Sequence, residues 1–250
     1  VQMRIIITEN AVKLGEAAAK HTAEILSGAI RDSGAARLIL STGQSQFETI
    51  EALLKQEVDW SKVEVFHLDE YIGLPVSHPA SFRRYLTERF TGKVRLRAFY
   101  PVNGEGDTVS EIKKLSDLIL SRPVDIGLIG IGENAHIAFN DPPADFDTDS
   151  PYIVVTLDGK CRDQQVREGW FPDRESVPVQ AVSMSVQQIL RCRNIISSVP
   201  HTVKAHAVRM TLESPVTNMV PASILKTHPS FSLYLDMGSA AKIEMRRIQL

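Results

Sequence analysis

Three short polar segments each follow an apolar, strand-like run and carry residue types that can do chemistry. The first follows Leu38–Leu40 and opens a helical stretch; after Ser41 it contains Thr42, Gly43, Gln44 and Ser45. A hydroxyl-rich turn with one glycine at the start of a helix can offer backbone N–H groups and the helix dipole to a phosphate. An ordinary N-cap turn has the same composition, and the Walker pattern GxxxxGK[ST] is absent. The turn is therefore compatible with a phosphate site and with an ordinary N-cap turn.

The second segment, LDEYIGLP, places Asp69 and Glu70 at the end of the apolar run 63–68. A carboxylate at such a strand end can move a proton between neighbouring carbons of a substrate, provided that partial burial tunes its pKa. Two adjacent acids in this place are equally typical of a capping or salt-bridged pair. The residues alone leave both interpretations open.

The third segment, GIGENAHIAFNDP, spans residues 130–142 and begins at the end of the apolar run 124–131. Its glycines, Gly132 among them, allow a ligand close to the backbone, and His136 can exchange protons near neutral pH. Asn134 and Asp141 flank this histidine. A single histidine is more often structural, but its place in a glycine-led loop after a strand favours a functional role. No further ligands stand at metal spacing in the sequence, so zinc is not expected.

The elements that must position these segments alternate between β-rich and amphipathic runs, which predicts an α/β fold with a largely parallel sheet. We expect one domain over residues 1–250, with a loop at 141–150 that is a candidate lid. The expected strands are 3–8, 36–41, 63–68, 124–131, 152–156, 194–198 and 230–236. The expected helices are 10–34, 46–56, 80–90, 108–121, 183–192 and 201–213. Ligands bind outside the carboxyl ends of such strands, where the three segments lie.

Composition narrows the class of protein. The 250 residues are 43% hydrophobic, enough for a substantial core, and the net charge of −2 gives no basic stripe for nucleic acid. No apolar run approaches the roughly 18–20 residues that span a bilayer, and the first residues lack a signal-peptide pattern. The cysteines, Cys161 and Cys192, are far apart, which suits a reducing compartment. We expect a cytoplasmic protein whose partner is a small molecule, not nucleic acid or membrane.

The motifs LDEYIGLP, with His78-Pro79 and Ser81 behind it, and GIGENAHIAFNDP resemble the signature segments of glucosamine-6-phosphate deaminases, (M/L)DEYxGL and GxGxxGHIxFNEP. The resemblance continues through STGQS, VPHTVKAHAV and THPSFSLYLD, and so covers residues 3–236. It implies a modified Rossmann-like sheet with helices on both faces. It also implies conversion of glucosamine 6-phosphate, or a close epimer, to fructose 6-phosphate and ammonia without a metal or cofactor. A homo-oligomer is compatible with the sequence, which leaves the oligomeric state open.

The same resemblance implies roles for individual residues. Asp69 matches the base that moves a proton between C2 and C1, and His136 matches the residue that opens the pyranose ring. Asn134 and Asp141 match the groups that orient this histidine. The expected substrate-binding residues are Thr42, Gly43, Gln44, Ser45, Glu70, Gly132, Ala135 and Lys204, together with Arg162 or Arg167.

Several residues depart from the family pattern. Asp141 stands where the family has a longer glutamate, and Ala135 replaces a glycine, which strains the chain if that position needs a positive φ. The arginine-bearing NSRFF-like segment is replaced by CRDQQVREGWF, so Arg162 and Arg167 are both candidates for the phosphate. A lactonase on the same fold is an alternative, although its GxGxDGHTASLFP motif is not matched. A catalytically silent sugar-phosphate sensor is another, and Asp69 and His136 favour turnover over it.

Overall fold

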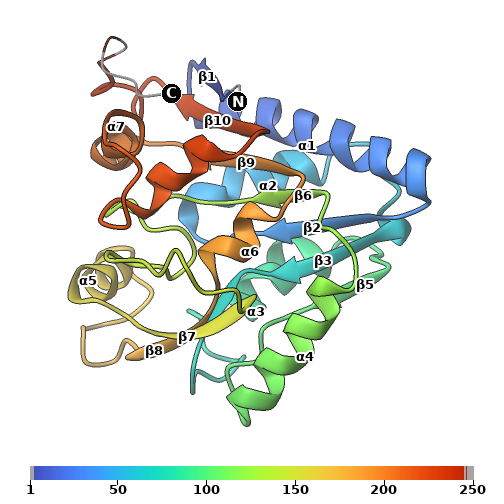
Figure 1. Cartoon of the computed structure of the whole chain (residues 1–250), viewed down its shortest axis with the longest axis horizontal. Helices are drawn as coiled ribbons and strands as arrows, with labels where there is room; N and C mark the ends of the chain where they lie inside the picture. The colour runs from blue at the N-terminus through green and yellow to red at the C-terminus, as the bar shows by residue number, and fades with distance from the viewer. Residues whose placement is uncertain (1–2, 245, 247–250) are drawn as a thin grey trace.

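The computed structural model describes residues 3–244 and 246, and its centre is a parallel sheet of seven strands (Figure 1). The strands lie in the order β1-β10-β9-β6-β2-β3-β5, and every neighbouring pair is parallel. Their bounds are β1 Arg4–Thr8, β2 Ala36–Leu40, β3 Val63–His67, β5 Ala98–Tyr100, β6 Ile126–Leu128, β9 Asn194–Val199 and β10 Phe231–Asp236. This confirms the predicted α/β class with a parallel sheet.

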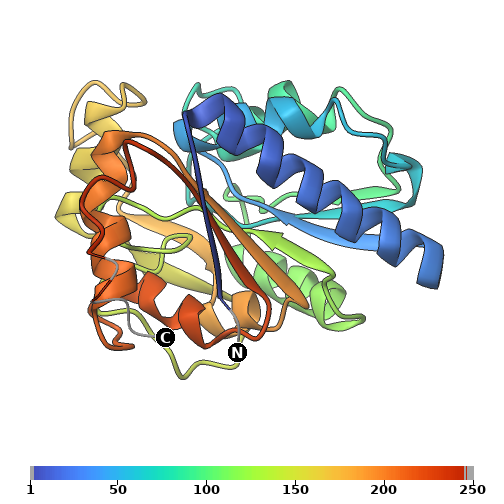
Figure 2. The ribbon, with the colours of Figure 1, turned by 90° about the horizontal axis from the view of Figure 1, so that it is seen from above.

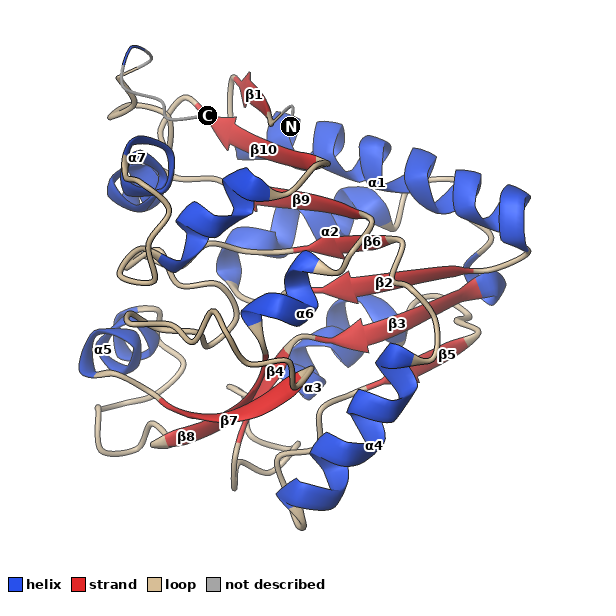
Figure 3. Cartoon of the chain, viewed as in Figure 1, coloured by secondary structure: helices blue, strands red, loops and turns tan. Residues whose placement is uncertain are grey.

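A second, antiparallel sheet of three strands stands beside the carboxyl ends of the first (Figure 3). It contains β4 (Asp69–Tyr71), β8 (Gln180–Met184) and β7 (Tyr152–Thr156) in the order β4-β8-β7. The run 152–156 is therefore a strand as expected, but it belongs to this smaller sheet. Because β4 follows β3 after a single residue, Asp69 lies where the two sheets meet.

Helices cover both faces of the parallel sheet (Figure 2). On one face α1 (Ala11–Ser33), α2 (Phe47–Leu53) and α3 (Phe82–Leu86) contribute to one hydrophobic core. On the other face α4 (Thr108–Leu120), α6 (Val186–Leu190) and α7 (Ala205–Glu213) contribute to a second core. The remaining helix, α5 (Gly159–Arg167), and the 3₁₀ segment Pro221–Thr227 complete the main elements. Within residues 3–244 and 246, no helix combines the length and apolarity needed to cross a membrane.

The termini of α1 show why local sequence predicted this helix. The Asn10 side chain accepts a hydrogen bond from the backbone N–H of Lys13, and Gly34 ends the helix in the left-handed conformation at φ 77°. Leu14 and Ala18 are buried as expected, whereas Ile25 and Ile30 are only partly buried. The cap residues therefore set the ends of α1 as the sequence predicted.

The structure differs from the secondary structure predicted from the sequence in several places. The predicted helix 183–192 begins late because Ser183 and Met184 belong to β8, and only Val186–Leu190 is helical. The short strands β4 and β5 and the whole of α5 were not predicted. In α5 the buried residues are Cys161, Gln164 and Gln165, so the segment has no apolar periodicity to reveal it.

Gly15 and Gly28 of α1 provide a matched test of the packing that supports the 41–45 turn. A Cβ on Gly15 would lie 2.6–2.8 Å from backbone atoms of Glu48 and Thr49 in α2, whereas one on Gly28 would meet only the Arg31 side chain at 3.7 Å. We expect Gly15→Ala to destabilise the protein by about 1–3 kcal/mol through overpacking. Gly28→Ala should stabilise it by up to about 1 kcal/mol through helix propensity. Urea unfolding of both variants measures this; stabilisation by Gly15→Ala would contradict the close α1–α2 contact.

Candidate functional site

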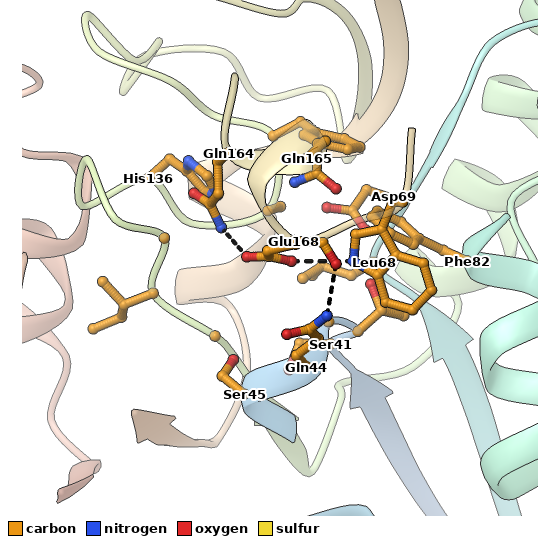
Figure 4. Close-up of a pocket in the computed structure, with 18 of the residues that line it drawn as sticks. Ser41, Gln44, Ser45, Leu68, Asp69, Phe82, His136, Gln164, Gln165 and Glu168 are labelled. Carbon is orange, nitrogen blue, oxygen red and sulfur yellow. Dashed lines mark hydrogen bonds between the residues drawn. The ribbon is translucent and has the colours of Figure 1, made fainter. Parts of the chain in front are cut away.

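A pocket at the carboxyl edge of the parallel sheet brings together residues that the sequence places far apart (Figure 4). The turn 41–45 follows β2, Asp69 follows β3, residues 130–139 follow β6, and Lys204 follows β9. From the predicted set, the pocket lining includes Thr42, Gly43, Gln44, Ser45, Asp69, Gly132, His136 and Lys204. Parallel strand ends thus gather these residues at one site.

The 41–45 turn is held open toward the pocket by its neighbours. Gly43 has a φ of 102°, a conformation that favours glycine, and its carbonyl accepts a hydrogen bond of 2.9 Å from the Tyr85 hydroxyl. Gln46 donates its side-chain amide to Ser45 Oγ and to the Ser198 carbonyl, both at 3.1 Å. The turn is thereby fixed to β9 and α3, with its hydroxyls and backbone beside the pocket.

Asp69 is buried at 5% exposure and lines the pocket. Burial raises the pKa of its carboxyl well above the usual value, and the negative charge of Glu70 adds to this effect. No hydrogen bond to the Asp69 side chain is found in the part of the chain that the structure describes. A carboxylate in this state is a stronger base than one in water, which suits proton abstraction.

Glu70 does not line the pocket, although it was expected among the substrate-binding residues. Its carboxylate is fully buried and accepts hydrogen bonds from Ser81 Oγ at 2.8 Å and from the Arg83 backbone N–H at 2.9 Å. The Arg83 guanidinium also lies 3.2 Å from the same oxygen, Oε2. For Glu70 the salt-bridged interpretation of the acid pair is therefore the right one, and this residue anchors β4 to α3.

His136, Asp141 and Asn134 form one contiguous group. His136 Nδ1 lies 3.1 Å from Asp141 Oδ1, and the Asn134 amide donates to that same oxygen at 3.0 Å. Asn134 Oδ1 in turn accepts the backbone N–H of His136 at 3.1 Å. Burial acts to raise the pKa of Asp141, but the contacts with His136 and Asn134 outweigh it and lower that pKa. The shorter aspartate therefore reaches the histidine.

The backbone around His136 is tightly fitted. A Cβ on Gly132 would lie 2.2 Å from the His136 ring, so the imidazole packs directly on this glycine. Ala135 has a φ of 65°, the left-handed conformation that the family's glycine would adopt without strain. Ala135 itself is fully buried and lies outside the pocket lining, so its expected substrate contact is not seen.

Cys161 lies beside the His136–Asp141 pair. Within residues 3–244 and 246, ligand atoms of His136, Asp141 and Cys161 lie within 4.8 Å of one another and could hold a metal ion. Sequence spacing gave no sign of this group, because Cys161 reaches the loop only through the placement of α5 in the fold. Burial, followed by the charges of Asp141 and Asp158, raises the pKa of the Cys161 thiol. A metal would have to displace this proton to bind sulfur.

Neither candidate arginine lies in the pocket. The Arg162 guanidinium donates to the backbone carbonyls of Arg174 and Val177. Arg167 lies 2.6 Å from Glu133 in an ion pair outside the pocket lining. The contact between one of these arginines and the phosphate, expected from the resemblance, is therefore not seen in this structure.

Helix α5 and the residues that follow it in the sequence contribute four residues to the pocket lining that the sequence analysis missed. They are Gln164, Gln165, Glu168 and Trp170. The Glu168 carboxylate accepts hydrogen bonds from Gln164 Nε2 at 2.6 Å and from Trp170 Nε1 at 3.1 Å. Asp158 caps the helix by accepting the Cys161 N–H. That N-cap aspartate, followed by a polar stretch in place of the family's arginine segment, was the available signal.

Lys204 is 6% exposed and lines the pocket. Burial lowers the pKa of Lys204, and the charges of Glu168 and Glu133 act in the opposite direction. A positive charge held at the wall of the pocket suits an anionic ligand.

Comparison with known proteins places the chain among sugar-phosphate enzymes. Residues 9–233 match the family described as glucosamine-6-phosphate isomerases/6-phosphogluconolactonase. The glucosamine-6-phosphate deaminase of Streptococcus pneumoniae (strain Hungary19A-6) is 32% identical over 97% of this chain and all of its own length. A solved monomeric glucosamine-6-phosphate deaminase has a TM-score of 0.87 and 30% identity, and the match covers 96% of this chain and all of that one.

A more distant likeness concerns the fold alone. A 6-phosphogluconolactonase from Shewanella baltica OS155 superimposes with a TM-score of 0.76 at 18% identity, over 94% of this chain and 97% of its own.

The raised pKa of Asp69 has a measurable effect on stability. Above that pKa the ionised carboxylate is buried at a cost, so Asp69 destabilises the folded state as pH rises through its folded-state pKa. We expect Asp69→Asn to be more stable than the wild type at pH 8 by about 1 kcal/mol or more, with the difference shrinking toward pH 4. Thermal unfolding across pH measures this. A variant that is less stable at pH 8 would show that the carboxylate is well solvated or paired.

Proposed function

The chain belongs to the glucosamine-6-phosphate isomerase/6-phosphogluconolactonase family, and we propose that it converts an amino-sugar 6-phosphate, glucosamine 6-phosphate or a close epimer, to fructose 6-phosphate and ammonia. The observation that carries the proposal is the pairing in one pocket of a buried carboxylate of raised pKa, Asp69, with the His136–Asp141 pair. The relatives named glucosamine-6-phosphate deaminase support it.

Ring opening is the first step. A proton leaves the hydroxyl at C1 and another reaches the ring oxygen, which yields an open-chain aldehyde. The imidazole of His136 borders the pocket and can carry such a proton, while Asp141 on its Nδ1 side fixes the orientation of the ring. Asn134 holds that carboxylate in place through its 3.0 Å hydrogen bond.

Proton transfer between carbons follows. The Asp69 carboxylate removes the proton from C2 and returns it to C1, while the amino nitrogen loses a proton and the C1 oxygen gains one, so that the amino aldehyde becomes an imine at C2 with a hydroxyl at C1. Water then adds to this imine and ammonia departs. One base suffices because both carbons present the same face of the planar intermediate to it.

The anionic end of the substrate is assigned to the 41–45 turn and Lys204. The residues of this turn and Lys204 all line the same pocket, and a hydroxyl-rich turn at a helix start together with a lysine suits a phosphate. The cytoplasm is the compartment that we propose, because Cys161 and Cys192 are both buried free thiols.

Ammonia release from a panel of amino sugars, each with and without a 6-phosphate, tests the function. We expect release from a 6-phosphorylated amino sugar, and a fall of about 10²–10⁴-fold in Asp69→Asn because a general base is lost. That variant should still bind a product analogue. More than half of wild-type turnover in Asp69→Asn would refute the assignment of the base.

Lys204→Ala probes the anion site. We expect KM for the 6-phosphorylated sugar to rise by about tenfold or more, with a much smaller change for the free sugar, since a charge-assisted contact to phosphate is lost. Steady-state kinetics on both sugars measure this. An equal rise for both would place Lys204 away from the phosphate.

Gly132→Ala tests whether turnover depends on the position of the His136 imidazole. Because the added Cβ would overlap the His136 ring, the ring must move, and a displacement of about 1 Å can cost about 10²-fold in rate. We expect kcat to fall by about that factor. The C2-proton exchange of an open-chain substrate, which needs only Asp69, should fall far less. Full activity in Gly132→Ala would mean that His136 has another productive position.

A further inference from the structure

Glu168 is a fixed carboxylate on the wall of the pocket, and the proposed reaction gives it no task. Its oxygens accept hydrogen bonds from Gln164 Nε2 and Trp170 Nε1, so the carboxylate is held in one position (Figure 4). A carboxylate has about four lone-pair sites. Two neighbours therefore leave it able to accept a further hydrogen bond from a ligand.

Glu168 lies next to the proposed anion site. Its backbone carbonyl accepts a hydrogen bond of 2.9 Å from the Gln44 side chain, which belongs to the 41–45 turn (Figure 4). Its charge also acts on Lys204, where it opposes the lowering of the pKa by burial. The turn, Lys204 and Glu168 therefore surround the same end of the pocket.

The charges at this end nearly cancel. Among the described residues that line the pocket, the basic side chains are Lys204 and His136, and His136 is paired with Asp141. Arg162 and Arg167, the other candidates for a phosphate ligand, are bound elsewhere. Beside the 41–45 turn, the described charged residues at this end of the pocket are therefore one lysine, Lys204, and one glutamate, Glu168.

We propose that Glu168 is a specificity-determining residue that makes this end of the pocket accept a singly charged anionic group in preference to a dianion. The proposal rests on the proposed function and refines its substrate class. A phosphate monoester carries about −1.5 to −2 charges at pH 7, with a second pKa of about 6. Beside Glu168 the dianion meets a like charge, whereas the monoanion donates its P–OH to the carboxylate.

The first test uses the unmodified enzyme at pH 8, where a phosphate monoester is almost entirely a dianion. Ammonia release is measured with an amino-sugar 6-phosphate and with the matching 6-sulfate, which is a monoanion of similar shape. We expect KM for the sulfate to be equal to or below KM for the phosphate. A KM at least tenfold lower for the phosphate would overturn the proposal.

The second test compares Glu168→Gln with Glu175→Gln, which removes the same charge from an exposed residue outside the pocket lining. In Glu168→Gln we expect KM for the 6-phosphate to fall by about tenfold or more, the 6-sulfate to gain less, and the free sugar to change little. Glu175→Gln should leave all these constants within about twofold. An unchanged or higher KM for the phosphate in Glu168→Gln would overturn the proposal. No ammonia from any amino sugar would instead refute the function itself.

Discussion

The site depends on keeping the Asp69 carboxylate buried in one position. The Asp69 side chain makes no hydrogen bond among the described residues, so its neighbours must hold the backbone. Glu70 supplies this anchor, because its fully buried carboxylate binds Ser81 and Arg83. On the next residue, the Tyr71 carbonyl packs so closely on Gly104 that a Cβ there would lie 1.9 Å away. The contacts of Glu70 and Tyr71 therefore hold the backbone on which Asp69 lies.

The small antiparallel sheet explains why this placement is possible. A strand of the parallel sheet normally ends in a loop, but here β3 continues after Leu68 into β4, which pairs with β8. The Tyr152 hydroxyl of β7 donates to the His67 carbonyl at 2.8 Å and ties the two sheets together. Asp69 therefore lies on a strand, and strands hold a catalytic side chain more precisely than loops do.

The sequence predicted the features that follow from local rules. Strong apolar runs such as Val63–His67 and the capped helix α1 were recognisable, as were the glycine-led loop and its histidine. What it missed depends on contacts between distant segments. Helix α5 buries glutamines instead of apolar residues, because it faces a polar pocket. Sequence spacing also gave no means of showing that Arg162 and Arg167 are bound outside the pocket, or that Glu168 lies within it.

The two residues that replace the family's glutamate and glycine near His136 still fit around this histidine. Asp141 is one methylene shorter than the family's glutamate, yet it lies 3.1 Å from His136 Nδ1 and is also held by Asn134. Ala135 adopts the left-handed conformation at φ 65°, which an alanine tolerates only at a cost of roughly 1–2 kcal/mol. The loop therefore keeps the histidine beside a carboxylate with residues that differ from the family pattern.

The variant His136→Gln tests most directly that His136 serves ring opening and Asp69 serves proton transfer between C2 and C1. The rate of ammonia release from the closed pyranose phosphate is measured beside solvent-deuterium incorporation at C2 of an open-chain analogue that cannot close its ring. We expect the first rate to fall by about 10²-fold or more while the second changes by only a few-fold, because Asp69 alone serves proton transfer once the ring is open. Equal losses in both measurements would contradict the assignment of His136 to ring opening.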